Sequence, residues 1–143
     1  MESKDLQNAK TLLTEGGHTC VLCKGDKVYT TTERGVKPLV RWLTEGTDLK
    51  NFSAADKVVG KATAYLYCLL GVKAVHSLVM SGAAAQVLEE NGISATQDKL
   101  VENIINRQGT GICPFEEAVW QIRDPQEALV SIRNKMAQMG IQL

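Results

Sequence analysis

Residues 106–117, NRQGTGICPFEE, contain the side chain best suited to covalent chemistry, the thiol of Cys113. Pro114 follows it, and Glu116 and Glu117 come soon after; a proline followed by acidic residues is typical of a helix start. Cys113 is therefore predicted at a helix N-cap, where the helix dipole and free N–H groups stabilise a thiolate and make it a better nucleophile. The two glutamates oppose this effect because they place negative charge nearby. Cys113 is the candidate catalytic residue.

Two interpretations of Cys113 stay open from the sequence. As a nucleophile it needs a base, and the fold would have to bring it His18 or His76, both distant in the chain. As a structural residue it caps the helix and packs, while Pro114 fixes the turn. In the first interpretation three polar residues before it are candidate ligand contacts: Asn106, Arg107 and Thr110.

A second set of candidates lies in residues 51–85, which read as an entry loop, a nearly all-apolar helix, a buried strand and a second helix. A helix start presents unpaired N–H groups and a partial positive charge, so two helix starts near one another make a ligand pocket. Lysine side chains beside them suit an anionic or polar ligand such as a nucleotide. The alternative is that Asp56 caps its helix and the lysines form a solvated face. The candidate ligand-binding residues are Asp56, Lys57, Lys61, Ser81 and Gly82.

Cys20 and Cys23 have a C-x-x-C spacing, but the surrounding segment HTCVLC is typical of a strand. A strand directs residues three apart to opposite faces of a sheet, which argues against a shared zinc ion or a redox role. His76 lies within an apolar run, where a packed, hydrogen-bonded core histidine is the favoured interpretation. No metal ion and no cofactor is predicted.

The composition favours one globular domain spanning residues 1–143, because 44% of the residues are hydrophobic and 22% are charged. Sixteen basic residues balance sixteen acidic ones without a run of like charge, which argues against binding to duplex nucleic acid or an anionic membrane. The sequence lacks a secretory signal pattern and an apolar run of about 20 residues, so a cytoplasmic location is expected. Trp42 and Trp120 are candidate anchors of a homo-oligomer interface, or they lie in the core.

Apolar periodicity and turn residues predict the elements that must position these side chains. Gly25 and Asp26 predict a tight β-hairpin of strands 18–24 and 27–31, and a strand over 72–80 is predicted to be covered on both faces. One central helix is predicted over 54–70, with Asp56 in its first turn and Gly60 where another backbone approaches closely. This order is typical of an α/β layered arrangement. The other predicted elements are helices at 3–14, 36–46, 81–91, 98–105, from 114 onward and at 125–139, and a short strand at 93–96.

Several of these stretches together resemble the cytidine deaminase-like superfamily, and more narrowly a bacterial family of unknown function within it. They are the hairpin CVLCKGDKVYT, the segment AADKVVGKA, the strand AVHSLVM followed by SGAAA, and CPFEEAV. The similarity extends from about residue 19 to about residue 122, and its most specific pieces are ERGVKPL, AADKVVGKA and TGICPFEEA. The resemblance implies a three-layer α/β/α sandwich with a mixed sheet.

Zinc deaminases of that superfamily carry a His-or-Cys, Ala, Glu triplet at the start of the central helix and a Pro-Cys-x-x-Cys element at a later helix start. These residues hold the zinc ion and move a proton. Here the matching stretches read AADK at 54–57 and SGAAA at 81–85, so neither supplies a zinc ligand or the glutamate. We therefore expect a metal-free protein that binds a nucleotide or a related metabolite. The alternatives are a cysteine-dependent enzyme using Cys113 and a homo-oligomeric interaction or scaffold protein.

Overall fold

The computed structural model describes residues 2–106 and 108–143, in which six helices and five strands are formed. In chain order they are α1 (Lys4–Glu15), β1 (Cys20–Lys24), β2 (Lys27–Thr31), α2 (Lys37–Glu45), β3 (Ser53–Val59), α3 (Lys61–Leu70), β4 (Ala74–Ser81), α4 (Gly82–Glu90), β5 (Ser94–Val101), α5 (Pro114–Ala118) and α6 (Pro125–Gln138).

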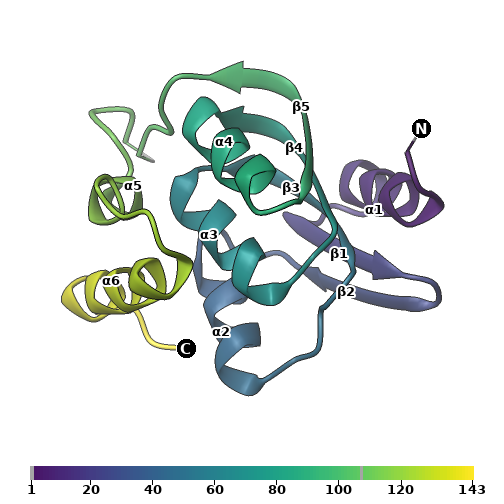
Figure 1. Ribbon diagram of the computed structural model, residues 1–143, viewed down its shortest axis with the longest axis horizontal. Helices are drawn as coiled ribbons and strands as arrows, with labels where there is room; N and C mark the ends of the chain where they lie inside the picture. The colour runs from purple at the N-terminus through teal and green to yellow at the C-terminus, as the bar shows by residue number, and fades with distance from the viewer. Residues whose placement is uncertain (1, 107) are drawn as a thin grey trace.

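In the described residues the strands form a five-stranded mixed sheet in the order β2-β1-β3-β4-β5 (Figure 1). β1 is antiparallel to both β2 and β3, whereas β3, β4 and β5 run parallel. Parallel strands need crossover connections, and α3 and α4 supply them. Because α3 follows β3 and α4 follows β4, and the two strands run parallel, both helices begin at the carboxyl ends of the strands. The fold is therefore α/β, as predicted.

The first two strands confirm the predicted hairpin. Lys24 pairs with Lys27 at its closed end, and Gly25 has a φ of +58°, a conformation that glycine adopts without strain. The hairpin places Cys20 next to β3, the strand that holds Asp56.

The prediction of one helix over 54–70 is wrong in its first part. Residues 53–59 form β3, which is hydrogen-bonded to β1 on one side and to β4 on the other. Alanine-rich residues favour a helix locally, but the ladder hydrogen bonds on both sides override that preference. The helix begins at Lys61 after the N-cap Gly60, so Asp56 lies in a strand and caps no helix.

The prediction of a helix over 98–105 is also wrong. β5 continues to Val101 and pairs in parallel with β4 along its length. As an edge strand it has few buried side chains, and Leu100 is 57% exposed. A strand of this kind lacks the apolar alternation by which strands are recognised in a sequence.

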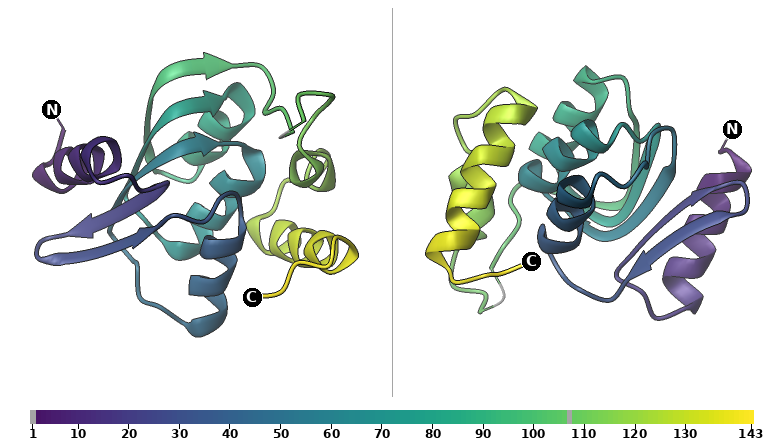
Figure 2. Two further views of the ribbon diagram at one scale, coloured as in Figure 1. Left: turned by 180° about the vertical axis from the view of Figure 1, so that it is seen from behind. Right: turned by 90° about the horizontal axis from the view of Figure 1, so that it is seen from below.

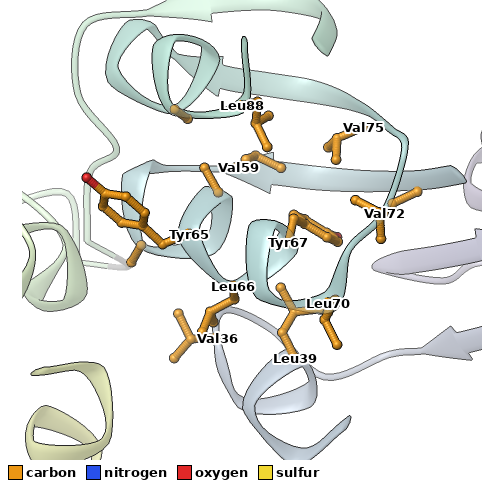
Figure 3. Packing of buried hydrophobic residues seen from close by; sticks show 14 of the residues in the cluster. Val36, Leu39, Val59, Tyr65, Leu66, Tyr67, Leu70, Val72, Val75 and Leu88 are labelled. Carbon is orange, nitrogen blue, oxygen red and sulfur yellow. The ribbon is translucent and has the colours of Figure 1, made fainter. Parts of the chain in front are cut away.

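Helices cover both faces of the sheet (Figure 2). α1 packs on one face, where Ala9 and Leu13 contact a small cluster containing Val21 and Ala55. The larger core lies on the other face under α3 and α4, and α2 packs beside α3. Figure 3 shows the side chains of this core around α3, among them Leu66 and Tyr67, both of which are fully buried.

α5 and α6 pack against α3 on the side away from the sheet (Figures 1 and 2). Asp124 begins α6 as its N-cap, because its side-chain oxygen accepts a hydrogen bond from the Glu127 N–H at 3.0 Å. Ala128, Ile132 and Met136 are the buried residues of α6. None of the described helices combines the length and the apolar character that crossing a membrane requires.

Candidate functional site

A cavity of about 1000 Å³ opens beside the start of α3. Its walls come from parts of the chain that are far apart in sequence, at positions 19–20, 33–39, 56–58, 60, 62–63, 104–106, 108, 113–116 and 139–142. Four residues selected from the sequence line it together: Asp56, Lys57, Asn106 and Cys113. The fold therefore brings members of both sets of candidates to one place.

Asp56 lies on β3, in register with Cys20 of β1 and Ser77 of β4. Its Oδ2 accepts a hydrogen bond of 2.7 Å from the hydroxyl of Tyr67, which reaches it from α3. The same hydroxyl lies 3.1 Å from the Cys20 sulfur. Because the hydroxyl proton is donated to Asp56, the thiol of Cys20 donates to the Tyr67 oxygen. Cys20, Tyr67 and Asp56 thus form a hydrogen-bonded chain that ends at the cavity.

Burial sets the protonation states in this chain. It raises the pKa of Asp56 to about 6, although hydrogen bonds from Tyr67 and from neighbouring backbone groups act in the opposite direction. Burial and the Asp56 charge raise the pKa of Cys20 and that of Tyr67 well above their ordinary values. At neutral pH Cys20 and Tyr67 are therefore protonated donors, and Asp56 is the group that can change charge.

Glu116 of α5 occupies the start of α3. Its Oε1 accepts a hydrogen bond from the Lys61 N–H at 2.8 Å, and its Oε2 accepts one from the Ala62 N–H at 2.9 Å. The side chain is 8% exposed, and a Cβ on Gly60 would lie 2.5 Å from its Oε1. A close approach at Gly60 was predicted, but a carboxylate makes it, not another backbone. The free N–H groups expected to bind a ligand here are held by the protein itself.

Lys61 is directed to the C-terminal helices. Its ammonium donates a hydrogen bond of 3.1 Å to the carbonyl of Trp120 and lies 5.8 Å from the ring centroid of Tyr65. Burial lowers the pKa of Lys61, and the Glu116 charge opposes that shift. Lys57, by contrast, is exposed and lines the cavity.

Ser81 and Gly82 begin α4 next to the start of α3, because Met80 pairs with Val59 at the ends of their strands. The Ser81 hydroxyl accepts a hydrogen bond from the Ala84 N–H at 3.1 Å and so acts as the N-cap. Within the part of the chain that the structure describes, neither residue lines the cavity. The two helix starts are neighbours, but of the two only the start of α3 borders the cavity.

Cys113 is the N-cap of α5 and Pro114 its first residue, in agreement with the prediction. The Cys113 carbonyl accepts hydrogen bonds from the N–H groups of Glu116 and Glu117, at 2.9 and 3.2 Å. The thiol is half-buried. Cys113 therefore fixes the turn through its backbone and presents its side chain at the cavity wall.

Asn106 and Thr110 close a turn before Cys113. The Asn106 side-chain oxygen accepts a hydrogen bond from the Thr110 N–H at 3.0 Å, and its NH₂ group donates to the Thr110 hydroxyl at 3.2 Å. Asn106 also lines the cavity, whereas Thr110 serves this turn. Arg107, a third predicted contact, falls outside the described residues.

The stretch AADK at 54–57, which the sequence matched to the zinc-binding helix start of deaminases, lies in β3 and not at a helix start. The start of α3 offers Gly60, Lys61 and backbone N–H groups bonded to Glu116, and the start of α4 offers a hydroxyl bonded to its own helix. Zinc sites require thiolate, imidazole or carboxylate ligands with free lone pairs. Among residues 2–106 and 108–143, no three His, Cys, Asp or Glu side chains lie together as metal ligands.

The remaining residues considered in the sequence are two cysteines, a histidine and two tryptophans. Cys20 and Cys23 belong to the cores on opposite faces of the sheet, which confirms the predicted directions of their sulfurs. His76 is buried, and its Nδ1 lies 2.8 Å from the Thr96 hydroxyl. Trp42 packs against the core, whereas Trp120 is 57% exposed.

Sequence reasoning missed the roles of Cys20, Tyr67 and Glu116. A signal for Tyr67 was present, because a tyrosine within an almost wholly apolar helix needs a partner for its hydroxyl. Gly60 was a partial signal for Glu116, because a glycine within a predicted helix indicates that another group approaches closely. The partner was hidden because residues 60 and 116 are far apart in the chain.

The chain is similar to proteins of one family. The sequence profile described as TM1506, domain of unknown function (DUF1893), matches residues 8–136. The crystal structure of a DUF1893 family protein (TM1506) from Thermotoga maritima matches with a TM-score of 0.84 and 25% sequence identity. The match covers 96% of this chain and 92% of that one. Comparison with curated proteins gives no match. Because the profile covers most of its length, the chain belongs to the DUF1893 family, a domain of unknown function.

Proposed function

We propose that this protein binds a nucleotide or a related polar metabolite in the cavity beside α3, on a cytidine deaminase-like three-layer α/β/α scaffold without zinc deaminase chemistry. The observation that carries the proposal is the meeting of Asp56, Lys57, Asn106 and Cys113 around one cavity of about 1000 Å³. Cavities of about 300–1000 Å³ with apolar walls and a few polar groups are typical of small-molecule sites.

The lining of the cavity supports a ligand with a flat apolar part and polar ends. Val58, Ile105 and Phe115 provide apolar surface, while Lys57 and Asn106 provide a cation and an amide. An amide can both donate and accept hydrogen bonds, and a lysine can bind an anionic group. Nucleosides and nucleotides combine these features.

A thermal-shift screen with nucleosides and nucleotides tests the proposal. A ligand that binds the folded state raises its stability by about 2.7 kcal/mol at one hundred times its Kd, which shifts the melting temperature by several degrees. We expect at least one compound of the panel to produce such a shift. A flat response across the panel would contradict the proposal.

A cysteine-dependent enzyme is a second candidate, favoured by the presence of Cys113 and Asp56 in the same cavity. Asp56 is the group there that can accept a proton near neutral pH, since burial raises its pKa to about 6. If Asp56 acts as the base, iodoacetamide should alkylate Cys113 more slowly in Asp56→Asn than in the wild type at neutral pH. Equal rates of alkylation in the two proteins would argue against this candidate.

A further inference from the structure

The Asp56 carboxylate retains capacity to bind a ligand. Oδ2 accepts the Tyr67 hydroxyl at 2.7 Å, whereas the donor at Oδ1 is the Val58 N–H at 3.4 Å, which is long for a hydrogen bond. Each carboxylate oxygen has two lone pairs, so both can accept further donors. The side chain is half-buried and lines the cavity.

Two buried groups hold this carboxylate in place. Tyr67 is fully buried in α3, and its hydroxyl is in turn fixed by Cys20 of β1, which is 3% exposed. Because Asp56 is in a strand paired on both sides, its backbone is fixed as well. A group positioned in this way binds a ligand at a low cost in conformational entropy.

The part of the cavity wall formed by Asp56 and the start of α3 favours a hydrogen-bond donor over a phosphate. The first N–H groups of α3 would be the natural partners of an anionic group, but Glu116 already accepts from both Lys61 and Ala62. Asp56 and Glu116 both line the wall, so it carries acceptors. The cavity lining also contains three basic residues, Arg34, Lys37 and Lys57.

We propose that Asp56 binds two adjacent N–H donors of the ligand, as in the N1–H and 2-amino edge of guanine or in a guanidinium group. A carboxylate accepts such a pair through two parallel hydrogen bonds. Val58 and Ile105, which are exposed residues of the lining, provide apolar surface for the group that carries the donors. This inference rests on the proposed function and narrows its ligand class.

Calorimetric titration of the wild-type protein with guanosine, inosine and methylguanidine tests this inference without a variant. Inosine lacks the 2-amino group, and the loss of one hydrogen bond to a charged acceptor should weaken binding about tenfold or more. Competition of methylguanidine with guanosine would support the donor pair as the shared feature. Guanosine binding without that competition would support the nucleobase as the source, and binding of methylguanidine alone would support a guanidinium ligand.

Asp56→Asn provides the second arm, with Asp26→Asn in the exposed hairpin turn as its matched control. We expect the first variant to lose the preference for guanosine over inosine or the binding of methylguanidine, whichever the wild type shows, and the second to keep it. Melting curves establish that both variants fold. Equal affinity of the wild type for guanosine and inosine without methylguanidine binding would overturn this inference and leave the proposed function standing. No binding of any nucleoside, nucleotide or methylguanidine would overturn both.

Discussion

The carboxylates of Asp56 and Glu116 line the same cavity but differ in their hydrogen-bond partners. Both oxygens of Glu116 accept backbone N–H groups of α3, so this side chain completes a helix. Asp56 accepts a short hydrogen bond from Tyr67 and a long one from the Val58 N–H, and it lines the cavity. A half-buried acid whose charge is incompletely compensated costs stability, and such groups are found mainly at functional sites.

Replacement of Asp56 by asparagine should change how stability depends on pH. The pKa of Asp56 in the folded protein is raised from 3.8 to about 6, so the folded state binds more protons than the unfolded state between these values. Stability due to this group is thus present below about pH 4 and lost as the pH rises through 6. Asp56→Asn should therefore gain stability relative to the wild type as the pH increases.

Urea unfolding of the wild type and of Asp56→Asn at pH 4, 6 and 8 measures this difference. Because all other titrating groups are shared, the difference between the two proteins isolates Asp56. A difference that is constant with pH, or that favours the wild type at pH 8, would contradict the raised pKa.

Glu116 gives a prediction about stability. Glu116→Ala removes the acceptor of two N–H groups at a buried helix start, and hydrogen bonds to charged groups contribute about 1.5–3 kcal/mol. Glu117→Ala, at an exposed neighbouring position of the same helix, should change the free energy of unfolding by no more than about 0.5 kcal/mol. Chemical denaturation of both variants checks this contrast, and equal effects would show that Glu116 holds no special contact.

At the scale of single residues, Asp56 was named as a candidate ligand-binding residue from a wrong structural prediction. It was expected to stand at a helix start, whereas it lies in a strand at the wall of the same cavity as Cys113. Its partners Tyr67 and Cys20 could not be foreseen, because their meeting depends on the pairing of β1 with β3. The local sequence shows that a polar residue stands among apolar ones, but its contacts depend on the fold.

At the scale of elements, the start of α3 depends on the contact between Gly60 and Glu116. A Cβ at position 60 would meet the Glu116 carboxylate at 2.5 Å, and that carboxylate is held by two hydrogen bonds and yields only by breaking them. Gly60→Ala should therefore cost about 1–3 kcal/mol in the wild type. In a Glu116→Ala background the same substitution should cost less than about 1 kcal/mol, the ordinary preference for glycine over alanine at an N-cap.

A double-mutant cycle of Gly60→Ala and Glu116→Ala measures this coupling by urea unfolding. The two effects should be non-additive by 0.5 kcal/mol or more, as is usual for residues in contact. Additive effects would indicate that the two elements do not meet at Gly60.

The elements that the sequence predicted correctly carry local signals. Gly25 and Asp26 specify the hairpin, Ser81 caps α4, and Pro125 begins α6. The parts it predicted wrongly, β3 and the second half of β5, are defined by their neighbours. β3 is an alanine-rich strand between two others, and β5 is an exposed edge strand held by β4. Non-local pairing leaves little trace in such sequences.

At the scale of the whole molecule, the cavity joins the α/β sheet to the C-terminal helices. Asp56 and Lys57 come from the sheet, Cys113 from the segment before α5, and residues 139–142 from the chain after α6. The sequence could not place these parts together, because nothing in it states how α5 and α6 pack on α3. The position of α6 is therefore decisive for the shape of the site.

The packing of α6 on α3 leads to a prediction for the molecule as a whole. Ile132 is fully buried beneath α6, and Val130 on the same helix is 60% exposed. Ile132→Ala leaves a cavity in the core and should lower the free energy of unfolding by about 2–5 kcal/mol, whereas Val130→Ala should change it by about 0.5 kcal/mol or less. Because α3 lies between α6 and the sheet, we expect the whole chain to unfold in one transition in both variants. Urea denaturation followed by tryptophan fluorescence and by circular dichroism tests this. Separate transitions, or equal effects of the two substitutions, would show that α6 is not part of the same core and that the C-terminal wall of the cavity forms independently of the sheet.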